Sequence, residues 1–318
     1  MTDTLQDTYD VVVIGGGAAG LNGALMLARS RRSVVVVDAG SPRNAPADGV
    51  HGLLGHDGIP PGELLARGRE EVRRYGGHVV TGEVKSVARN DQGFVVVLSD
   101  GRRTRARRLL VATGLVDELP DVPGLRERWG RDVLHCPYCH GWEVRDQAIG
   151  VLSTGPMSVH QALLLSQLSD DIVFFPHTAP ALADEEAAQL AARDIRVVTG
   201  PVAGIEITED RIRGVRLADG TLEPRQAIAV APRFAARAGF LAGIGLTVVE
   251  HPSGAGEHIP SDMGATAVPG VWVAGNVTDL SAQVGAAAAA GALAGARINA
   301  ELVMEETRAA MTAAREAV

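Results

Sequence analysis

The sequence predicts an α/β protein with two domains, and three observations lead to this prediction. A β-branched run, Asp10–Ile14, ends in glycines and is followed by a helical stretch, Ala18–Arg29, and a second buried run, Ser33–Val37. This order is typical of a βαβ unit with parallel strands. A second strand–helix–strand pattern follows at Ile149–Phe175. With 318 residues, the chain is also longer than one hydrophobic core usually serves.

Periodicity and turn residues assign the remaining elements. The expected helices are Pro61–Tyr75, Ser158–Leu168, Ala183–Arg193 and Leu280–Leu302, with a separate charged helix from Glu305. The expected strands outside the first βαβ unit are Val84–Ala88, Gly93–Leu98, Arg105–Val111, Ile149–Leu152, Ile172–Phe175 and Val271–Ala274. The chain is expected to return to its first domain near Gly245. We therefore predict one discontinuous domain, 1–117 with 245–318, around a middle domain, 118–244.

Composition narrows the class of protein and its location. The chain has 46% apolar and 21% charged residues and a net charge of −8, which is the balance of a globular enzyme. It has no Lys/Arg run with interleaved aromatics, so no nucleic-acid partner is expected. Met1–Asp10 has no basic segment typical of a secretory signal, and the Ala-rich Gly285–Ala296 is too short to span a bilayer. We expect a cytoplasmic protein that does not enter a membrane.

A glycine-rich turn joins the first strand to the first helix. Gly15-Gly-Gly17-Ala18-Ala19-Gly20 fits the G-x-G-x-x-G pattern, and Asp38 ends the next strand. Gly15 permits a tight turn, Gly17 lets the backbone approach a pyrophosphate, and Gly20 allows close packing. The helix N-terminus favours negative charge, and Asp38 can accept hydrogen bonds from a ribose. The alternative is a tight turn without a ligand, but strand, helix and acidic residue together favour a dinucleotide.

Two later segments are candidates for the same site. Leu109–Gly114 is a strand that ends in Ala112-Thr113-Gly114, and Val271–Asn276 is a strand followed by a helix. Taken alone, each is an ordinary strand followed by a turn. Together with the first glycine-rich turn, they are consistent with one split dinucleotide site.

The strongest local signal is His135-Cys136-Pro137-Tyr138-Cys139-His140-Gly141, which holds both cysteines of the chain. A bond between residues so close in sequence constrains the unfolded chain very little, so a structural disulfide is disfavoured. Half of a zinc site is the rival interpretation, but a second CxxC pair is missing, and no metal is expected. A redox-active disulfide is therefore predicted, with His140 or His135 as the base that accepts a thiol proton.

These motifs, in this order, resemble the low-molecular-weight thioredoxin reductases over nearly the whole chain. The resemblance implies two Rossmann-like domains of the three-layer ββα type, FAD bound by the discontinuous domain, and a homodimer. It also implies that Cys139 faces the flavin, that Cys136 exchanges with substrate, and that His140 replaces an acidic acid/base residue. The residues matching the flavin-contacting C-terminal segment are Gly275, Asn276, Gln283 and Val284.

The departures from the family pattern concern the second nucleotide site. Of the glycine-rich turn expected in the middle domain only Gly155 is present, followed by Pro156, and the next strand ends in Phe175-Pro176-His177 without an arginine. A nicotinamide site is therefore not expected. Asn276 also stands where the family has an Asp.

These departures, with the Cys-Pro-Tyr-Cys-His-Gly-Trp motif, resemble the FAD-dependent dithiol oxidases of antibiotic and toxin biosynthesis of the holomycin and gliotoxin type. That resemblance implies oxidation of a small-molecule dithiol to its intramolecular disulfide, with O2 as electron acceptor and H2O2 as product. The alternatives are a thioredoxin-type reductase driven by NADPH or ferredoxin, and a flavin-bound redox sensor. Substrate choice is expected to depend on the surroundings of His51–His56, for which no sequence code exists.

Overall fold

The computed structural model describes residues 3–316 and divides into two compact units. Unit 1 comprises the chain up to Ala45, Pro60–Val116, and the chain from Phe234 on. Unit 2 comprises Pro46–Ile59 and Asp117–Arg233. Strands β7 (Leu115–Glu118) and β16 (Arg233–Ala236) pair with each other and carry the chain across the two later divisions. Each unit is an α/β domain, which confirms the predicted fold class.

Unit 1 is built on a seven-stranded sheet in the order β3-β2-β1-β6-β5-β4, with β19 also paired to β6. Strands β3, β2, β1, β6 and β19 are parallel, and β4, β5 and β6 form an antiparallel meander. The strands of unit 1 are β1 (Thr8–Ile14), β2 (Val34–Asp38), β3 (His78–Thr81), β4 (Val84–Asn90), β5 (Gly93–Leu98), β6 (Arg103–Val111), β17 (Val249–Glu250), β18 (Glu257–His258) and β19 (Val271–Val273). Its helices are α1 (Ala18–Arg29), α2 (Pro61–Arg74), α7 (Val284–Glu316), and the 3-10 turns η2 (Gly239–Ile244) and η3 (Gly275–Val277).

The central sheet of unit 1 is buried on both faces, so its strands are continuously apolar. Val11 and Val13 of β1 pack with α1, α2 and α7 on one face. Val12 and Ile14 alternate to the other face, where the meander and η2 cover them. This is the three-layer arrangement in which a parallel sheet lies between helices and antiparallel strands.

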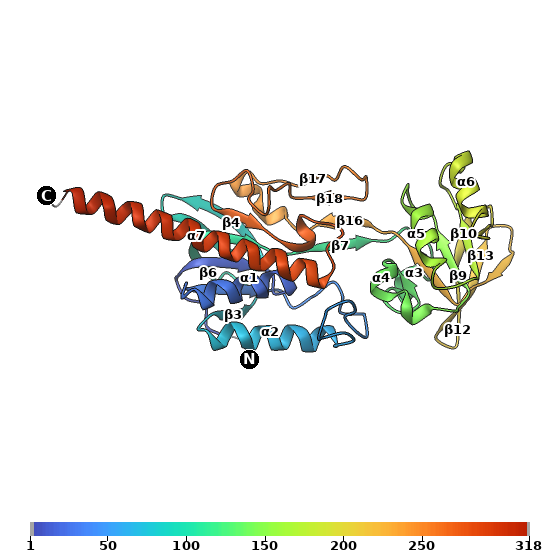
Figure 1. The fold of residues 1–318 in the computed structure, drawn as a ribbon, viewed down its shortest axis with the longest axis horizontal. Coiled ribbons are helices and arrows are strands. Elements are labelled where there is room, and N and C mark those ends of the chain that lie inside the picture. The colour runs from blue at the N-terminus through green and yellow to red at the C-terminus, as the bar shows by residue number, and fades with distance from the viewer. Residues whose placement is uncertain (1–2, 317–318) are drawn as a thin grey trace. The chain divides into compact units, whose positions relative to one another are not determined.

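Helices α1 and α7 approach each other backbone to backbone on the same face of the sheet (Figure 1). A Cβ atom added to Gly291 of α7 would lie 1.9 Å from the carbonyl oxygen of Ala19, and one added to Gly295 would lie 2.6 Å from that of Gly23. Only glycine permits this distance. The close packing fixes the N-terminal turn of α1, and with it the glycine-rich turn that precedes this helix.

Unit 2 is built on a five-stranded parallel sheet in the order β11-β10-β9-β15-β8. Its strands are β8 (Val133–Leu134), β9 (Ile149–Leu152), β10 (Ile172–Phe175), β11 (Arg196–Val197), β12 (Val202–Thr208), β13 (Arg211–Leu217), β14 (Leu222–Pro224) and β15 (Ala227–Val230). Its helices are α3 (Leu125–Arg128), α4 (Pro137–His140), α5 (Ser158–Leu165), α6 (Asp184–Ala191) and the 3-10 turn η1 (Trp142–Val144).

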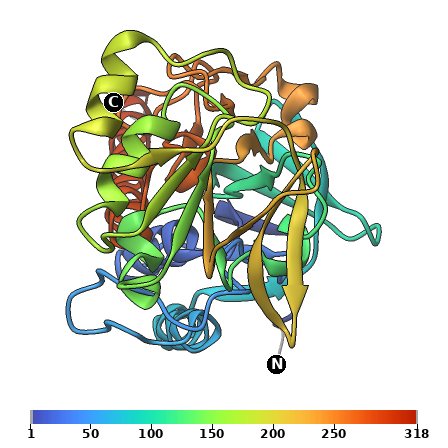
Figure 2. The same ribbon diagram turned by 90° about the vertical axis from the view of Figure 1, so that its right-hand side faces the viewer.

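The layers of unit 2 repeat those of unit 1. Val151 and Phe174 pack with α5 and α6 on one face of the sheet. Leu152 and Phe175 pack with the antiparallel sheet β12-β13-β14 on the other. Figure 2 shows the helices and the antiparallel hairpin on opposite sides of these strands. Two units of the same three-layer kind confirm the predicted architecture.

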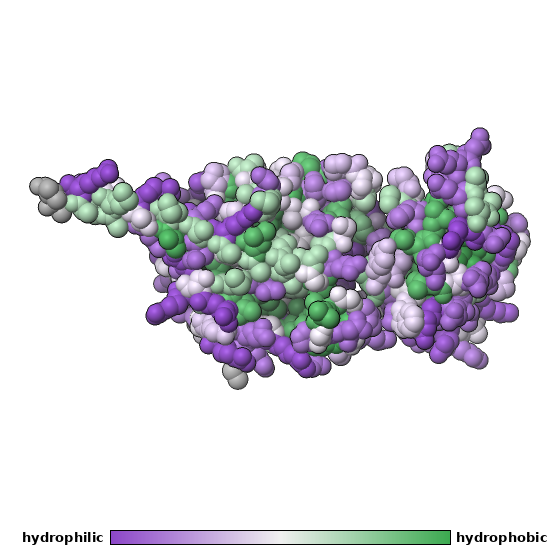
Figure 3. All heavy atoms as spheres, in the orientation of Figure 1, coloured by the Kyte–Doolittle hydropathy of each residue, from purple (hydrophilic) through white to green (hydrophobic). Residues whose placement is uncertain are grey.

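Helix α1 has the predicted bounds, as do strands β9 and β10, but the predicted C-terminal helices are wrong in two respects. Helix α7 begins at Val284 rather than Leu280, and it runs without a break to Glu316, so no separate helix begins at Glu305. Glu305 and Glu306 hold the later part of α7 to the sheet through ion pairs with Arg107 of β6. Met304 and Met311, one on each side of this acidic pair, are exposed. Figure 3 shows hydrophilic and apolar atoms mixed along this end of the helix.

The observed units differ from the predicted division in two places. Residues 234–244 belong to unit 1, because Arg237 N donates to Gly114 O (3.2 Å) and Leu241 is buried in the unit 1 core. Residues 46–59 belong to unit 2, although their sequence neighbours on both sides belong to unit 1. Pro46 packs over Gly130, where an added Cβ would lie 2.6 Å from Pro46 Cβ.

Within residues 3–316, no helix is both long and apolar enough to cross a membrane.

Candidate functional site

The glycine-rich turn of unit 1 leaves an open cradle at the N-terminus of α1. A Cβ added to Gly15, which has φ +106°, would lie 2.4 Å from Ala112 O, so Gly15 lets β1 and β6 end side by side. A Cβ added to Gly20 would lie 1.8 Å from Gly15 O. Gly17 is different, because no atom lies within 4 Å of its added Cβ, and as the N-cap residue it has no side chain that could cap the helix. The first N–H groups of α1 therefore face open space suited to an anion.

Asp38 lies at the end of β2 beside this turn. Its Oδ1 accepts hydrogen bonds from Gly16 N and Gly40 N, both at 3.3 Å. A Cβ added to Gly16 would lie 2.6 Å from Asp38 Cγ, so the second glycine is also required. Arg69 Nη1 lies 3.9 Å from the second carboxylate oxygen. The two backbone bonds fix the carboxylate and leave acceptor capacity for a ribose hydroxyl.

Ala112, Thr113 and Gly114 follow β6 at the same edge of the sheet. The hydroxyl of Thr113 donates to Arg237 O at 2.7 Å, and Gly114 has φ +66°. The segment therefore contacts both Gly15 and the chain that returns from unit 2. Sequence reasoning placed these three residues at the dinucleotide site, and the structure places Ala112 directly against its glycine-rich turn.

Gly275 and Asn276 connect β19 to α7. A Cβ on Gly275 would lie 3.0 Å from Ala19 Cβ, which places this turn against the start of α1. Asn276 Nδ2 donates to Asp279 O (3.0 Å) and Ala282 O (2.9 Å), whose loop precedes Gln283 and Val284. A carboxylate has no proton to donate to these carbonyls. The Asn276 amide thus organises the loop that delays the start of α7.

Arg43 is a residue of this region that the sequence analysis missed. Its Nη1 lies 3.4 Å from Asn276 Oδ1, and its guanidinium lies 5.1 Å from the centroid of the Phe234 ring. It stands in an irregular stretch rich in Pro and Asn, where no periodicity or motif marks a single arginine. Its position offers a cation beside the segment that the flavin is expected to contact.

The two cysteines form a disulfide in unit 2, with a Cα–Cα distance of 5.2 Å. Cys136 follows β8, and Pro137 begins the single turn of α4, where it needs no hydrogen bond to its missing N–H. Cys139 N and His140 N both donate to Cys136 O, at 3.2 and 3.1 Å. A Cβ on Gly141 would lie 2.3 Å from Pro137 O, so the turn must end in glycine.

His135 and His140 flank the disulfide, and both are half-buried, as are the two cysteines. Gln161 of α5, which is itself buried, donates from Nε2 to His135 O at 2.5 Å and so holds the end of β8. Burial lowers the pKa of His140 below its usual value, and Glu143, His51 and Asp48 modify this shift. This direction favours the neutral form of His140, which is the form that can accept a proton.

The turn after β9 in unit 2 occupies the place that the glycine-rich turn has in unit 1. Here Thr154 N and Gly155 N donate to Ser158 Oγ at 3.1 and 3.3 Å, and Ser158 is fully buried. Pro156 has no N–H. At the end of β10, His177 Nδ1 accepts a hydrogen bond from Val202 N at 2.9 Å. Two backbone N–H groups of this turn are thus engaged within the protein.

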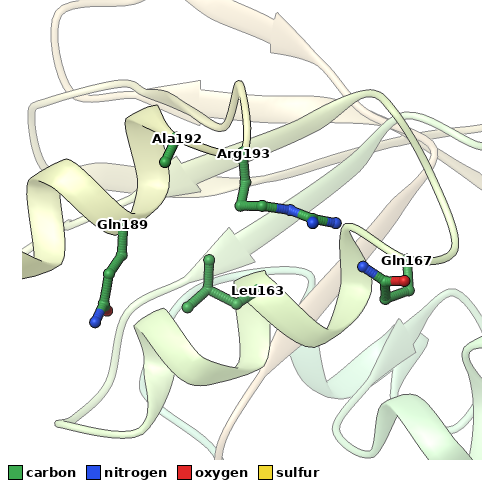
Figure 4. Close-up of a pocket in the computed structure, with 5 residues that line it drawn as sticks. All are labelled: Leu163, Gln167, Gln189, Ala192 and Arg193. Carbon is green, nitrogen blue, oxygen red and sulfur yellow. The ribbon is translucent and has the colours of Figure 1, made fainter.

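A shallow depression of about 400 Å³ lies between α5 and α6 (Figure 4). It is lined by Leu163, Gln167, Gln189, Ala192 and Arg193. Arg193 Nε donates to Ser166 Oγ at 3.2 Å, so its charge is turned toward the helix end. None of the predicted site residues lines this depression.

In the described part of the chain, no three His, Cys, Asp or Glu residues gather as a metal site would require.

Comparison with known proteins assigns this geometry to a family. The model of the pyridine nucleotide-disulphide oxidoreductase family matches residues 9–297, which span both the glycine-rich turn and the disulfide. The chain belongs to this family. Thioredoxin reductase tcpT of Claviceps purpurea is 31% identical over 94% of this chain and 96% of its own length. Thioredoxin reductase sirT of Leptosphaeria maculans is 33% identical over 93% and 95%.

Among solved structures of the family, HlmI is 46% identical and superposes with a TM-score of 0.92, covering 100% of this chain and 99% of its own. The protein is thus an FAD oxidoreductase of the thioredoxin reductase-like kind, and the predicted enzyme class and cofactor are confirmed. The open cradle at Gly17 and the carboxylate of Asp38 suit the pyrophosphate and ribose of FAD.

Proposed function

We propose that this enzyme is a dithiol oxidase, which converts a small-molecule dithiol to its intramolecular disulfide and delivers the electrons to O2. The observation that carries the proposal is the closed turn of unit 2. Because Ser158 Oγ takes the N–H groups of Thr154 and Gly155, a nicotinamide dinucleotide lacks its pyrophosphate donors there. A family member without that electron source is expected to take electrons from thiols, which is the direction opposite to a reductase.

The redox pair and its histidine supply the chemistry on the protein side. A substrate thiol transfers its proton to neutral His140, with His135 as the alternative base, and the thiolate attacks Cys136 Sγ. The Cys136–Cys139 bond breaks, and Cys139 leaves as a thiolate. The second substrate thiol attacks the substrate sulfur of the mixed disulfide, which releases the cyclic disulfide and leaves both cysteines reduced.

When bound, FAD would supply the two-electron acceptor needed for the two reduced cysteines to return to the disulfide, with O2 as the final acceptor and H2O2 as the product. The net reaction is dithiol plus O2 to cyclic disulfide plus H2O2, in which two electrons and two protons leave the substrate. The cradle at Gly17, with Asp38, would hold the dinucleotide part of the cofactor, and the Gly275–Val284 segment would lie along its flavin part, with Gly275, Asn276, Gln283 and Val284 in contact.

A small substrate also suits the surface beside the disulfide. Tyr138, between the cysteines, and Trp142, just after the α4 turn, expose 69% and 64% of their surface. Arg145 stacks over the Trp142 ring at 4.2 Å from its centroid. Exposed aromatic rings offer apolar faces to a compact ligand.

The proposal also includes a homodimer like that of the thioredoxin reductases, for which sedimentation should give the mass of two chains.

The test is an anaerobic titration of the flavin absorbance, adding NADPH first, then dithiothreitol as a probe dithiol, then air. We expect bleaching only by the dithiol, and recovery in air with one H2O2 per dithiol oxidised. Cys136→Ser and Cys139→Ser should each abolish turnover and leave the protein yellow. Rapid bleaching by NADPH would identify a reductase. Flavin that is reduced only once and slowly, with no turnover in air, would identify a redox sensor.

A further inference from the structure

The loop 46–59 places a histidine, His51, between two carboxylates. His51 is half-buried, with its Nδ1 3.6 Å from Asp57 Oδ2 and its Nε2 3.4 Å from Glu143 Oε1. Asp57 lies on the same loop, and Glu143 lies on η1, three residues after His140. Each ring nitrogen of His51 therefore faces a carboxylate, and all of these residues belong to unit 2.

The backbone of the loop holds this arrangement. Val50 N donates to Ile59 O and Gly58 N donates to Val50 O, both at 2.8 Å, which closes the loop into a hairpin. Asp57 Oδ1 accepts from Gly52 N at 2.9 Å, so the carboxylate beside His51 is fixed from both sides. A tightly closed loop places His51 more reproducibly than an open one, because less conformational freedom remains to be lost.

His140 is surrounded by charges from two segments. Glu143 acts on it from η1, and His51 and Asp48 act on it from the loop. Burial lowers the pKa of His140, Glu143 and Asp48 raise it, and His51 lowers it. Glu143 is shared, because it contacts His51 and also favours the protonated form of His140. The redox pair itself lies beside His140 in the chain.

We propose that His51 is a positioning residue of the redox site, which acts through Glu143 to keep His140 in the neutral form that accepts a thiol proton. By holding Glu143, His51 reduces the charge that this carboxylate presents to His140. This inference rests on the proposed function only for its kinetic consequence, since the electrostatic coupling concerns residues of this chain alone.

Removing His51 and removing the charge of Glu143 should shift the pKa of His140 in opposite directions. In His51→Gln the carboxylate of Glu143 is no longer paired, so it stabilises protonated His140 and raises its pKa. In Glu143→Gln the favourable charge is lost, so the pKa of His140 falls further. For partly exposed groups we expect shifts of about half a unit to one unit. Because protonated His140 cannot accept a proton, the acid limb of thiol oxidation moves to higher pH in the first variant and lower pH in the second.

The experiment is a ¹H–¹³C NMR titration of the His140 Cε1 signal in the FAD-loaded protein, for the wild type, both variants and the double variant. His160→Gln, which removes an exposed histidine of α5, is the matched control and should leave the His140 titration unchanged. If His51 acts through Glu143, removing His51 raises the pKa of His140 less in the absence of Glu143 than in its presence. No shift in His51→Gln, or an equal shift with and without Glu143, would overturn the proposal.

A second readout is the pH dependence of the anaerobic rate at which dithiothreitol reduces the flavin. Its acid limb should move with the His140 titration in each variant. A titration that shifts while the limb stays fixed would contradict the role of His51 in thiol deprotonation. If dithiols do not reduce the wild-type flavin at all, the proposed function fails, and the NMR shifts alone still decide the coupling.

Discussion

The turns after β1 and after β9 occupy the same place in two similar domains, and they differ in what occupies the space before the following helix. In unit 1, Gly15 N and Gly16 N bond to Val37 O and Asp38 Oδ1, but Gly17 leaves open space before α1 and has no side chain to cap the helix. In unit 2, the buried Ser158 Oγ accepts from Thr154 N and Gly155 N, and Pro156 contributes no donor. The first turn therefore keeps an open helix start for a ligand, whereas a side chain of the protein engages two N–H groups of the second.

Two sheets of the same kind thus carry turns with different surroundings, so the capacity to hold a dinucleotide is expected to depend on a few atoms at the turn rather than on the sheet. The covering helices differ as well. Helix α1 is fixed by backbone contact with α7, whereas α5 is covered by α6 with a shallow depression between them.

The largest expected effect is on FAD binding, and it would test the open turn against the closed one. Gly17→Ala should fold, because its added Cβ meets no protein atom within 4 Å, but that Cβ fills the pyrophosphate cradle. We expect FAD to bind at least about tenfold more weakly, or about 1.4 kcal/mol. Release of fluorescent FAD on dilution measures this.

The matched control is Gly155→Ala in unit 2, where the added Cβ also meets no atom within 4 Å. This variant should retain FAD at the wild-type level. Equal loss of FAD in both variants would contradict the distinction between the two turns.

The next effect concerns the helix that fixes the open turn. Gly291→Ala places a Cβ 1.9 Å from Ala19 O, so α7 and α1 must separate. We expect the free energy of unfolding to fall by about 1 to 3 kcal/mol, although alanine favours a helix by about 1 kcal/mol over glycine. Urea unfolding followed by circular dichroism measures it.

Ala296→Gly is the control on the exposed side of the same helix, and it should lose no more than about 1 kcal/mol. If Gly291→Ala raised the stability, the close contact would not be what holds α1 in place.

The smallest effect is expected at the closed turn. Ser158→Ala removes the acceptor of two N–H groups, which should lower the free energy of unfolding by about 1 kcal/mol. It should not create reduction by NADPH, because Pro156 still lacks a donor and His177 remains engaged with Val202. Thermal melting and an NADPH absorbance assay measure the two results.

Ser166→Ala, just after the other end of α5, is the control, because the hydroxyl of Ser166 donates to Leu163 O and accepts from Arg193 Nε but is less buried than that of Ser158. A Ser158→Ala enzyme whose flavin NADPH reduces would show that one hydroxyl alone keeps the nucleotide site closed.

Much of this site was predictable because its signals are local. The turn Gly15–Gly20 and the pair Cys136–Cys139 are short motifs, and the spacing of their residues indicates their chemistry. The bounds of α1 followed from apolar periodicity. The start of α7 was not predictable in this way, because it depends on the Asn276 amide that holds Asp279 and Ala282. Ala-rich periodicity gives no sign of such a loop.

The sequence by itself determined the fold class and the cofactor and marked the cysteine pair, since each rests on residues adjacent in the chain. Tertiary structure alone decided that loop 46–59 joins unit 2 and that His51 meets Glu143. The physical reason is that a contact between distant segments depends on how both are packed. The sequence of loop 46–59 has no local pattern that predicts which residue each of its side chains contacts.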